Sequence, residues 1–520
     1  MNNIKESHLI WVAVLLLIPT LFYKLGDLNI FFGVDEATRA IVSMEMMLRE
    51  NYSISTINGE IYAKKPPLYN WILVIFFKLF GYSEFVLRLP NALSLLAFGS
   101  SVYLFNKKYF GKTHAAILGL MIICCGRVLF WESLFGYIDI LFSLVIYTSL
   151  LSMHKFYFEK KYWSLYLITY GLTLIAFMLK GLPAIVFQGL SLLALLIWKR
   201  SWRSLFNVQH IVSGFLFLGI LFFYYWSISA QGNPVDIIST LWTESAKRTA
   251  ANFTLLHTLK HIGSFPFEMI MHYAPWTFLI PYLFLKKSRA LLREDTFLRF
   301  SLIIFFCNLI VYWISPTVYP KYILMLVPLL YSVSYKCFLH ADEKHTRYFM
   351  WLLIFVLMII PIGPFILAFV EGVNLVSLQG FKLFLAGCAL ALSAYIAFRS
   401  NKLVFLCVLI SMIILRLLFV DFIWLKRDDK LKIFEKDAIE IAKIIQDGKV
   451  YYLNWQPVQH ANSFRLTRVT NKIVGIERAG AKAGVFYLVK DKKNLDKAHK
   501  VYYEYRDVQK NEKVYLVKFE

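Results

Sequence analysis

A chain of 520 residues that is 58% hydrophobic and only 17% charged, with a mean hydropathy of +0.57, is too apolar to be a soluble globular protein. The formal net charge of +23 could suggest a nucleic-acid partner, but much of the Lys and Arg forms short clusters between apolar runs. Basic residues in that position set membrane topology by facing the cytoplasm. The composition therefore predicts a multi-pass membrane protein that binds membrane lipids and no nucleic acid.

The apolar runs predict a mainly α fold with about thirteen membrane-spanning helices, each of roughly 20 residues. We expect spans at 8–25, 86–105, 114–131, 138–154, 163–179, 182–198, 211–229, 268–285, 298–314, 322–339, 348–370, 378–398 and 403–424. The segment 67–81 is apolar but short, and a crossing there would move every later basic cluster to the outside. The positive-inside rule therefore predicts a helix that lies in the outer membrane interface.

This topology divides the chain into a transmembrane domain, 1–426, and a polar tail, 427–520. With the N-terminus inside, the loops 26–85 and 230–267 and the tail all face outward. The tail has a charged helical stretch at 431–446 and β-type runs at 450–453, 472–476, 485–489 and 514–519. We expect a small soluble α/β domain on the outer side of the membrane.

The first outer loop, 26–85, contains the densest group of chemically reactive residues. It begins with Gly33-Val34-Asp35-Glu36-Ala37-Thr38-Arg39 and continues through Asn58-Gly59, Tyr62-Ala63-Lys64-Lys65-Pro66-Pro67-Leu68 and, at the entry to the next span, Arg88-Leu89-Pro90. Taken alone, two acids at a helix start are ordinary, because they oppose the positive end of the helix dipole. An ion pair between Asp35 and Arg39, one turn apart, would be equally ordinary.

In this order the motifs resemble the bacterial protein mannosyltransferases of the glycosyltransferase C superfamily, and most closely the lipid A aminoarabinose transferases. Those proteins share a DE…R helix, an NG…Y…KPPL…W loop and an RLP entry into the second span. Asp139, Lys180-Gly181 and Tyr319-Pro320-Lys321-Tyr322 match as well. The resemblance implies thirteen spans, an outer C-terminal domain, and a bacterial inner-membrane enzyme that transfers a sugar with inversion from a polyprenyl-phosphate donor at the periplasmic face.

The resemblance also suggests roles for individual residues. Asp35 and Asp139 are the expected catalytic carboxylates, which take a proton from an acceptor hydroxyl or orient the acceptor. The expected substrate-binding residues are Glu36, Arg39, Tyr62, Lys64, Lys65, Arg88, Lys180, Arg248, Lys321 and Tyr322. The cations among them would neutralise the charge of the leaving phosphate. Without the resemblance, Asp139 is equally well read as a helix cap, and Lys180 as a lysine reaching for the interface.

Metal dependence is in doubt because of one departure from the family pattern. The relatives usually carry a Glu immediately before the Lys-Pro-Pro motif, whereas this chain has Lys64. An ammonium group cannot ligate a divalent cation but can take over its electrostatic role. In the second outer loop, Glu244, His257 and His261 could supply ligands, although that pattern is weak.

Other functions remain open from the residues alone. A lipid or solute transporter would place ionisable groups at mid-span depth, whereas the acids singled out here lie at the outer ends of spans. A membrane scaffold would leave the Asp-Glu and Lys-Pro-Pro motifs without a purpose. Within the enzyme class, the acceptor is lipid A, another glycolipid, or a protein hydroxyl as in O-mannosyl transfer.

Overall fold

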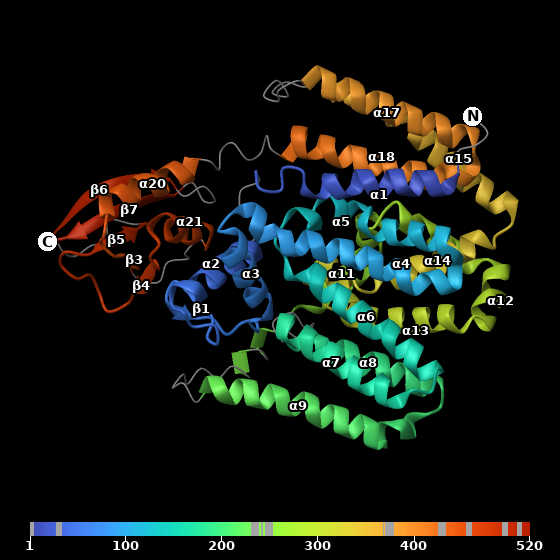
Figure 1. Cartoon of the computed structure of the whole chain (residues 1–520), viewed down its shortest axis with the longest axis horizontal. Coiled ribbons are helices and arrows are strands. Elements are labelled where there is room, and N and C mark those ends of the chain that lie inside the picture. The colour runs from blue at the N-terminus through green and yellow to red at the C-terminus, as the bar shows by residue number, and fades with distance from the viewer. Residues whose placement is uncertain are drawn as a thin grey trace.

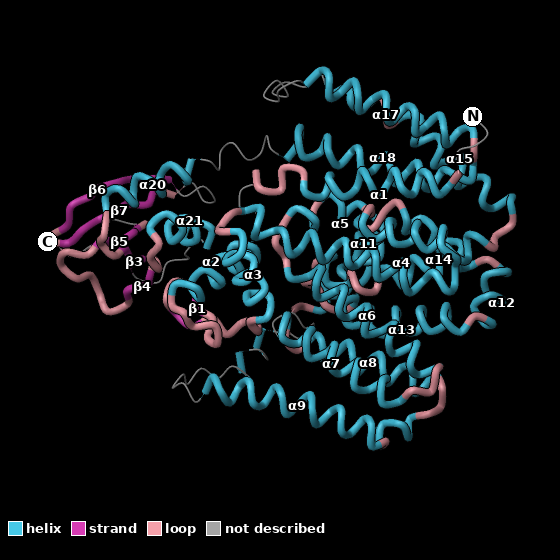
Figure 2. The backbone as a smooth tube through the Cα atoms, viewed as in Figure 1, coloured by secondary structure: helices cyan, strands magenta, loops and turns pink. Residues whose placement is uncertain are grey.

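The computed structural model describes residues 5–27, 34–229, 239–240, 243–244, 253–367, 369, 379–424, 433–453, 460–490, 498–506 and 512–520. A large helical bundle occupies most of the molecule, and a smaller unit with the C-terminus projects from one of its ends (Figure 1). All strands of the larger sheet belong to that unit, as Figure 2 shows. The mainly α membrane fold with a small C-terminal α/β domain is confirmed.

Helices account for nearly the whole bundle. They are α1 (Glu6–Phe22), α2 (Val34–Leu48), α3 (Leu68–Phe80), α4 (Glu84–Ile123), α5 (Gly126–Phe130), η1 (Glu132–Leu134), α6 (Ile138–Phe158), α7 (Tyr162–Lys180), α8 (Pro183–Trp198), η2 (Trp202–Phe206), α9 (Val208–Ser229), α11 (Leu255–His272), η4 (Trp276–Phe284), α12 (Lys286–Glu294), α13 (Thr296–Trp313), η5 (Pro320–Ile323), α14 (Val327–Leu339), α15 (Glu343–Ile359), α16 (Ile362–Leu367), α17 (Gln379–Arg399), η7 (Asn401–Leu403), α18 (Val404–Leu418) and η8 (Phe419–Trp424). Within the described residues, eight helical stretches are long and apolar enough to cross a membrane, and α1, α3 and α8 are shorter apolar helices.

Two of the expected spans lie within the 40 residues of α4. The chain turns at Gly111, whose φ of 75° favours glycine, and the two halves then approach through Gly99 and Gly119. A Cβ atom on Gly119 would lie 2.7 Å from the Gly99 carbonyl oxygen, so only glycine permits this approach. The spans expected at 86–105 and 114–131 are therefore two antiparallel helices, although the second ends at Ile123, before α5.

The expectation of one continuous helix was wrong at two other positions. The segment 268–285 consists of the end of α11 and the 3₁₀ helix η4, which are separated at Pro275, because proline lacks the amide hydrogen that an α-helix needs. The segment 322–339 likewise begins in the 3₁₀ helix η5, and α14 starts only at Val327. The first interruption precedes the Tyr-Pro-Lys-Tyr motif in the chain, and the second contains it.

The first and last membrane helices lie side by side. Helix α1 packs along α18 (Figure 1), and the Asp421 carboxylate joins them, since it accepts hydrogen bonds from the Tyr23 hydroxyl at 3.0 and 3.1 Å. The Lys24 ammonium lies 2.8 Å from the same carboxylate, and Lys382 of α17 lies 3.1 Å from it. Three helices are thus tied together at one end of the bundle.

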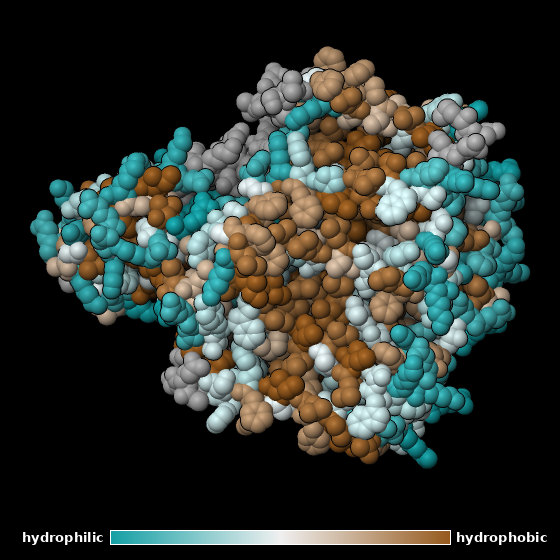
Figure 3. Space-filling view, viewed as in Figure 1, coloured by the Kyte–Doolittle hydropathy of each residue, from teal (hydrophilic) through white to brown (hydrophobic). Residues whose placement is uncertain are grey.

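The surface of the bundle carries the pattern of a membrane protein. On the face drawn in Figure 3, a broad hydrophobic zone separates the hydrophilic C-terminal unit from a hydrophilic surface at the opposite end. Helix α12, which carries the basic cluster Lys286, Lys287, Arg289 and Arg293, lies at that opposite end (Figure 1). The basic cluster and the C-terminal unit are therefore on different sides of the apolar zone, as the topology predicted.

The C-terminal unit is a five-stranded mixed sheet with two helices. It contains α20 (Ile433–Ile445), β3 (Val450–Leu453), α21 (His460–Thr470), β4 (Gly475–Glu477), β5 (Phe486–Val489), β6 (His499–Arg506) and β7 (Lys513–Phe519). The strand order is β4-β3-β5-β7-β6, with β3 parallel to both β4 and β5 and the remaining pairs antiparallel. The expected strands are confirmed, whereas α21 and β6 were missed. The boundary at 426/427 lies outside the described residues.

The first outer loop adds a small element of its own. Strands β1 (Thr56–Ile57) and β2 (Glu60–Ile61) form an antiparallel hairpin through Asn58 and Gly59, both with positive φ. The buried Glu45 carboxylate of α2 accepts hydrogen bonds from the Asn58 and Gly59 amides at 2.6 and 3.2 Å. The Asn-Gly motif is therefore a turn that α2 holds in place.

Candidate active site

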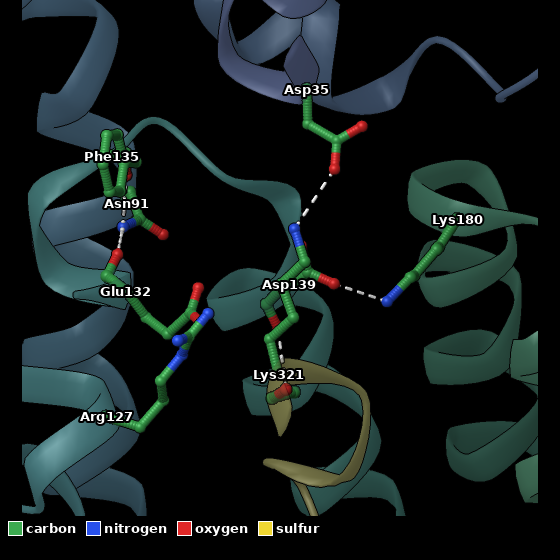
Figure 4. A network of polar contacts seen from close by, with 9 residues as sticks. Asp35, Asn91, Arg127, Glu132, Phe135, Asp139, Lys180 and Lys321 are labelled. Atoms are coloured by element: carbon green, nitrogen blue, oxygen red, sulfur yellow. Dashed lines mark hydrogen bonds and ion pairs between the residues drawn. The ribbon is translucent and has the colours of Figure 1, made fainter. Parts of the chain in front are cut away.

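Lys321 lies between the two carboxylates that the sequence singled out (Figure 4). Its Nζ atom is 3.1 Å from Asp35 Oδ2 and 3.2 Å from Asp139 Oδ2. The other oxygen of Asp139 accepts a hydrogen bond of 2.5 Å from Lys180. The ammonium of Lys321 also lies 4.0 Å from the centre of the Tyr137 ring. Two lysines and two aspartates thus form one network.

The network is assembled from four separate parts of the chain. Asp35 lies in the first turn of α2 and Asp139 in the first turn of α6. Lys180 is the last residue of α7, and Lys321 belongs to η5. Gly181, with φ of 83°, ends α7 directly after Lys180 and so places that ammonium at a helix C-terminus, where a cation is favoured.

The simpler readings of these residues do not hold in the structure. Asp139 makes no capping hydrogen bond, because α6 is preceded by Tyr137 and both carboxylate oxygens face lysines. Asp35 pairs with Lys321 instead of Arg39. The Lys180 side chain is only 10% exposed, so it does not reach into the interface as a solvated cation. Asp35, Asp139, Lys180 and Lys321 are thus held in place by the ion pairs that they form with one another.

The carboxylates of Asp35 and Asp139 differ in their exposure to solvent. The Asp35 side chain is 52% exposed, whereas those of Asp139 and Lys321 are 6% and 8% exposed. Burial acts to raise the pKa of Asp35, but the nearby ammonium groups of Lys65 and Lys321 outweigh it and hold the pKa below its usual value. Burial acts to lower the pKa of Lys321, and Asp139 and Asp35 raise it. Asp35 is therefore an ionised carboxylate that an incoming molecule can reach.

Glu36 and Arg88 were expected to bind substrate, but the structure pairs them with each other. Arg88 Nε and Glu36 Oε1 are 2.7 Å apart, and both side chains are 0% exposed. Arg88 also donates to the Leu25 carbonyl at 2.7 Å, and Glu36 accepts from the Gly136 amide at 2.8 Å. This pair therefore fixes the start of α2 against α4 and the chain before α6.

Breaking this pair should destabilise the fold more than it changes the chemistry. We expect Glu36→Gln to lower the free energy of unfolding by about 3–5 kcal/mol, because Arg88 would be left buried without a counter-charge. Glu60→Gln is the matched control, since Glu60 forms an exposed pair with Arg478 that contributes at most about 1 kcal/mol. Thermal unfolding in detergent would measure both, and equal unfolding temperatures would contradict the assignment.

Arg39 and Tyr62 connect α2 to the loop before α3. Arg39, which is 2% exposed, donates a hydrogen bond of 2.6 Å to the Tyr62 hydroxyl and stacks over the same ring. Burial and the nearby Asp35 and Glu244 carboxylates raise the pKa of Tyr62, although Arg39 acts in the opposite direction. Glu244 of the second outer loop therefore lies close to the site.

A solvent-open pocket lies beside the network. Lys65 and Tyr62 line it, together with apolar residues of the first outer loop. Tyr224, Tyr225 and Ile228 contribute the wall from the last turns of α9. Burial lowers the pKa of Lys65 to about 8, against the opposing effect of Asp35 and Asp139. The pocket thus combines one cation with an apolar wall that continues along a membrane helix.

The other expected residues lie outside the ion pairs of the network. Lys64 is exposed, and Tyr322 is buried beneath Lys180, whose ammonium lies 4.3 Å from the ring centre. Arg248 lies outside the described residues. His261 lies near the Tyr312 carbonyl at 3.5 Å. Among the residues that the structure describes, no three His, Cys, Asp or Glu side chains are grouped as a metal site would require.

The sequence reasoning missed a further acidic residue, Glu132, close to Asp139 of the network. Glu132 is 1% exposed, pairs with Arg127 at 2.8 Å, and has one oxygen without a hydrogen-bond partner. Asn91 anchors the same turn through the Glu132 and Phe135 carbonyls at 2.9 and 2.7 Å (Figure 4). The sequence Arg-Val-Leu-Phe-Trp-Glu at the end of an apolar run contained a signal, because a buried glutamate there requires a partner.

Known proteins share both the fold and part of the sequence. The ArnT structure from Cupriavidus metallidurans bound to undecaprenyl phosphate has a TM-score of 0.70 and 17% identity, and the match covers 98% of this chain and 97% of that chain. The apo structure of the same ArnT gives a TM-score of 0.71 at 17% identity. The profile of the family described as dolichyl-phosphate-mannose-protein mannosyltransferase matches residues 64–227. The chain has the glycosyltransferase C fold. The resemblance seen in the first-loop motifs is thereby confirmed.

Two curated relatives match over shorter regions. The undecaprenyl phosphate-alpha-4-amino-4-deoxy-L-arabinose arabinosyl transferase of Wigglesworthia glossinidia brevipalpis is 30% identical over 199 residues, which are 37% of this chain and 34% of that protein. An uncharacterized protein of Aquifex aeolicus (strain VF5) is 28% identical over 151 residues, 28% of this chain and 30% of that protein. The chain thus matches about a third of the length of these relatives, while the glycosyltransferase C fold extends over nearly all of it.

Proposed function

We propose that this protein is an inverting glycosyltransferase that moves a sugar from a polyprenyl-phosphate donor to a lipid A-type glycolipid at the periplasmic face of a bacterial inner membrane. The observation that carries the proposal is the network of Asp35, Asp139, Lys180 and Lys321 beside the pocket that Lys65 lines. The fold shared with ArnT and the partial match to an arabinosyl transferase support it.

The donor is assigned to the pocket by its chemistry. A polyprenyl phosphate joins an anionic head to a long apolar chain, so its site needs a cation next to an apolar surface at the membrane boundary. Lys65 supplies the cation, and Pro66, Pro67 and Ile228 supply apolar surface. As the sugar leaves, the phosphate gains a second negative charge, which ammonium groups stabilise more than they stabilise the bound donor.

The charges of the network favour a phosphate acceptor over a hydroxyl. A phosphate monoester has a second pKa of about 6 and is largely ionised at neutral pH, so its oxygen attacks the sugar without a base. A hydroxyl needs a base, and a carboxylate whose pKa is held low is a poor one. Asp35 is such a carboxylate, and both oxygens of Asp139 face lysines. We therefore assign Asp35 to orientation and charge stabilisation.

Purified full-length protein with defined donors and acceptors would test the function. Undecaprenyl phosphate carrying aminoarabinose or mannose would be combined with lipid A, dephosphorylated lipid A or a Ser/Thr peptide, and the products identified by mass spectrometry. We expect sugar on the phosphates of lipid A only. Transfer to the peptide would instead establish a protein O-mannosyl-type enzyme, and no transfer to any acceptor would refute the proposal. A parallel reaction in EDTA addresses metal dependence.

The pH dependence of donor use should follow Lys65. Its ammonium holds the donor phosphate, and with a pKa of about 8 the charged fraction falls as the pH rises through that value. We expect kcat/KM for the donor to decline above pH 8 in the wild type. Lys65→Arg should flatten this decline, because arginine stays charged throughout the range. A wild-type profile that is level from pH 7 to 9.5 would remove Lys65 from the donor site.

The proposed orientation places the network and the C-terminal unit outside and the turn at Gly111 inside. Single cysteines at Ser53 and at Lys112 test it, because they lie on opposite sides of the apolar zone in this topology. In intact spheroplasts an impermeant thiol reagent should label Ser53→Cys and leave Lys112→Cys unlabelled until the cells are opened. The reverse labelling pattern would show that the protein has the opposite orientation and that the site faces the cytoplasm.

A further inference from the structure

A hydrogen bond joins the C-terminal unit to the first turn of α2. Thr38 Oγ1 and His460 Nδ1 share a hydrogen bond of 2.7 Å, although the two residues are 422 positions apart. Thr38 is 5% exposed and His460 is half-buried. Helix α21, which His460 begins, packs along α2. The contact is therefore part of a packed interface between the C-terminal unit and the first outer loop.

Four separate parts of the chain contact residues 35–39, which form the first turn of helix α2. Asp35 is bound by Lys321 of η5, and Glu36 by Arg88 of α4. Arg39 is bound by Tyr62 of the loop before α3. Thr38 completes the set with His460, so each of these side chains fastens the turn to a different part of the chain.

Other contacts hold the hairpin of the first outer loop against the same unit. Asn58 Nδ2 donates to Ser463 Oγ at 2.9 Å and to the Val474 carbonyl at 2.8 Å. Arg478 and Glu60 form a bidentate pair at 2.6 and 2.8 Å, but this pair is exposed and lies on the hairpin, away from the turn. It provides a contact between the same two parts of the chain without touching α2.

We propose that His460 is a positioning residue, which through Thr38 aligns Asp35 and Arg39 with the lysines of the network; this rests on the proposed function. Burial, with Arg39 and Lys64 nearby, lowers the pKa of His460 to about 4, so the imidazole is neutral at the pH of the periplasm. A neutral ring beside Arg39 adds no repulsion and keeps a nitrogen available to the threonine hydroxyl. The C-terminal unit is thus a structural part of the active site.

The test uses full-length variants and measures kcat and KM for the donor separately. His460→Ala and Thr38→Val should each reduce kcat at least tenfold and change the donor KM less than threefold, because neither side chain lines the donor pocket. The double variant should be no slower than either single variant, since both remove one contact. His460→Asn keeps a polar atom at the δ position and should restore most of the rate. Arg478→Ala, which removes the exposed pair, should match the wild type.

A second measurement separates this proposal from the proposed function. Amide hydrogen exchange at residues 35–42 should be faster in His460→Ala and Thr38→Val than in Arg478→Ala, whatever reaction the protein catalyses. Exchange that is equal in all three would overturn the positioning role. Wild-type rates in folded His460→Ala, or single losses that multiply in the double variant, would overturn it as well. Absence of sugar transfer by the wild type would refute the function and leave the exchange result to decide the contact.

Discussion

Lys321→Met is expected to reduce sugar transfer at least a hundredfold at saturating donor. The substitution keeps most of the side-chain volume but removes the ammonium that Asp35 and Asp139 share. A charge held in place where the transition state gains charge contributes ~10²–10³ to kcat. Without it Asp35 loses its bound partner and Asp139 retains only Lys180. Steady-state transfer by purified protein would measure the loss.

Lys336→Met is the matched control for this experiment. Lys336 also combines one strong polar contact, 2.9 Å to the Tyr109 carbonyl, with an aromatic ring, that of Phe110 at 4.8 Å. It lies on α14 and has no contact with the network. We expect near-normal transfer by Lys336→Met. Equal losses in the two variants would show that burying a lysine against an aromatic ring matters for folding and that Lys321 has no special role.

Asp35→Asn is expected to slow transfer by a similar factor, ~10²–10³. The substitution preserves the size of the side chain but removes the negative charge that would face the sugar carbon as it becomes positive. If Asp35 were only a half-exposed partner of Lys321, the loss would correspond to at most about 1 kcal/mol, roughly a fivefold effect. The two roles therefore differ by more than an order of magnitude in rate.

The pH profile adds a second criterion for Asp35. The nearby ammonium groups of Lys65 and Lys321 hold its pKa below the usual value, so the carboxylate stays ionised throughout the neutral range. Transfer by the wild type should therefore show no decline that belongs to Asp35 between pH 6 and 8. Near-normal turnover by folded Asp35→Asn would refute its catalytic assignment and leave Asp139 as the remaining candidate.

The residues of the network could be predicted because they match the motifs of the resembled family, and their position in the membrane agrees with a role for their charge. Asp139, Lys180 and Lys321 lie at span ends, where an ionised group is costly unless it has a partner or a function. The sequence could not show which partner each would take. Arg88 is an example: it pairs with the buried Glu36, and a basic residue at a span entry has the same appearance in the sequence whether it binds a substrate or a glutamate.

The C-terminal unit was harder to predict in detail. Helix α21 was missed because its buried face contains Asn462, Ser463, Arg465 and Thr467, so no apolar periodicity marks it. Strand β6 was missed because it is an edge strand in which only Tyr505 is buried, so no regular alternation of buried apolar residues marks it. In both cases tertiary contacts that lie far away along the chain determine the local structure. For the same reason the sequence did not identify His460 as a site residue.

The hydrogen bond between Thr38 and His460 can form only late in the synthesis of the protein, because the two residues are far apart in the chain. At about 5–20 residues per second, the 422 positions between them take roughly 20–80 s to synthesise. The hydrogen bond between Tyr23 and Asp421 likewise forms late, because Asp421 is synthesised near the end of the membrane domain. Every lysine and aspartate of the network is therefore already synthesised before His460 can bind Thr38. A chain released before residue 460 contains the whole network and yet lacks the contact that completes it.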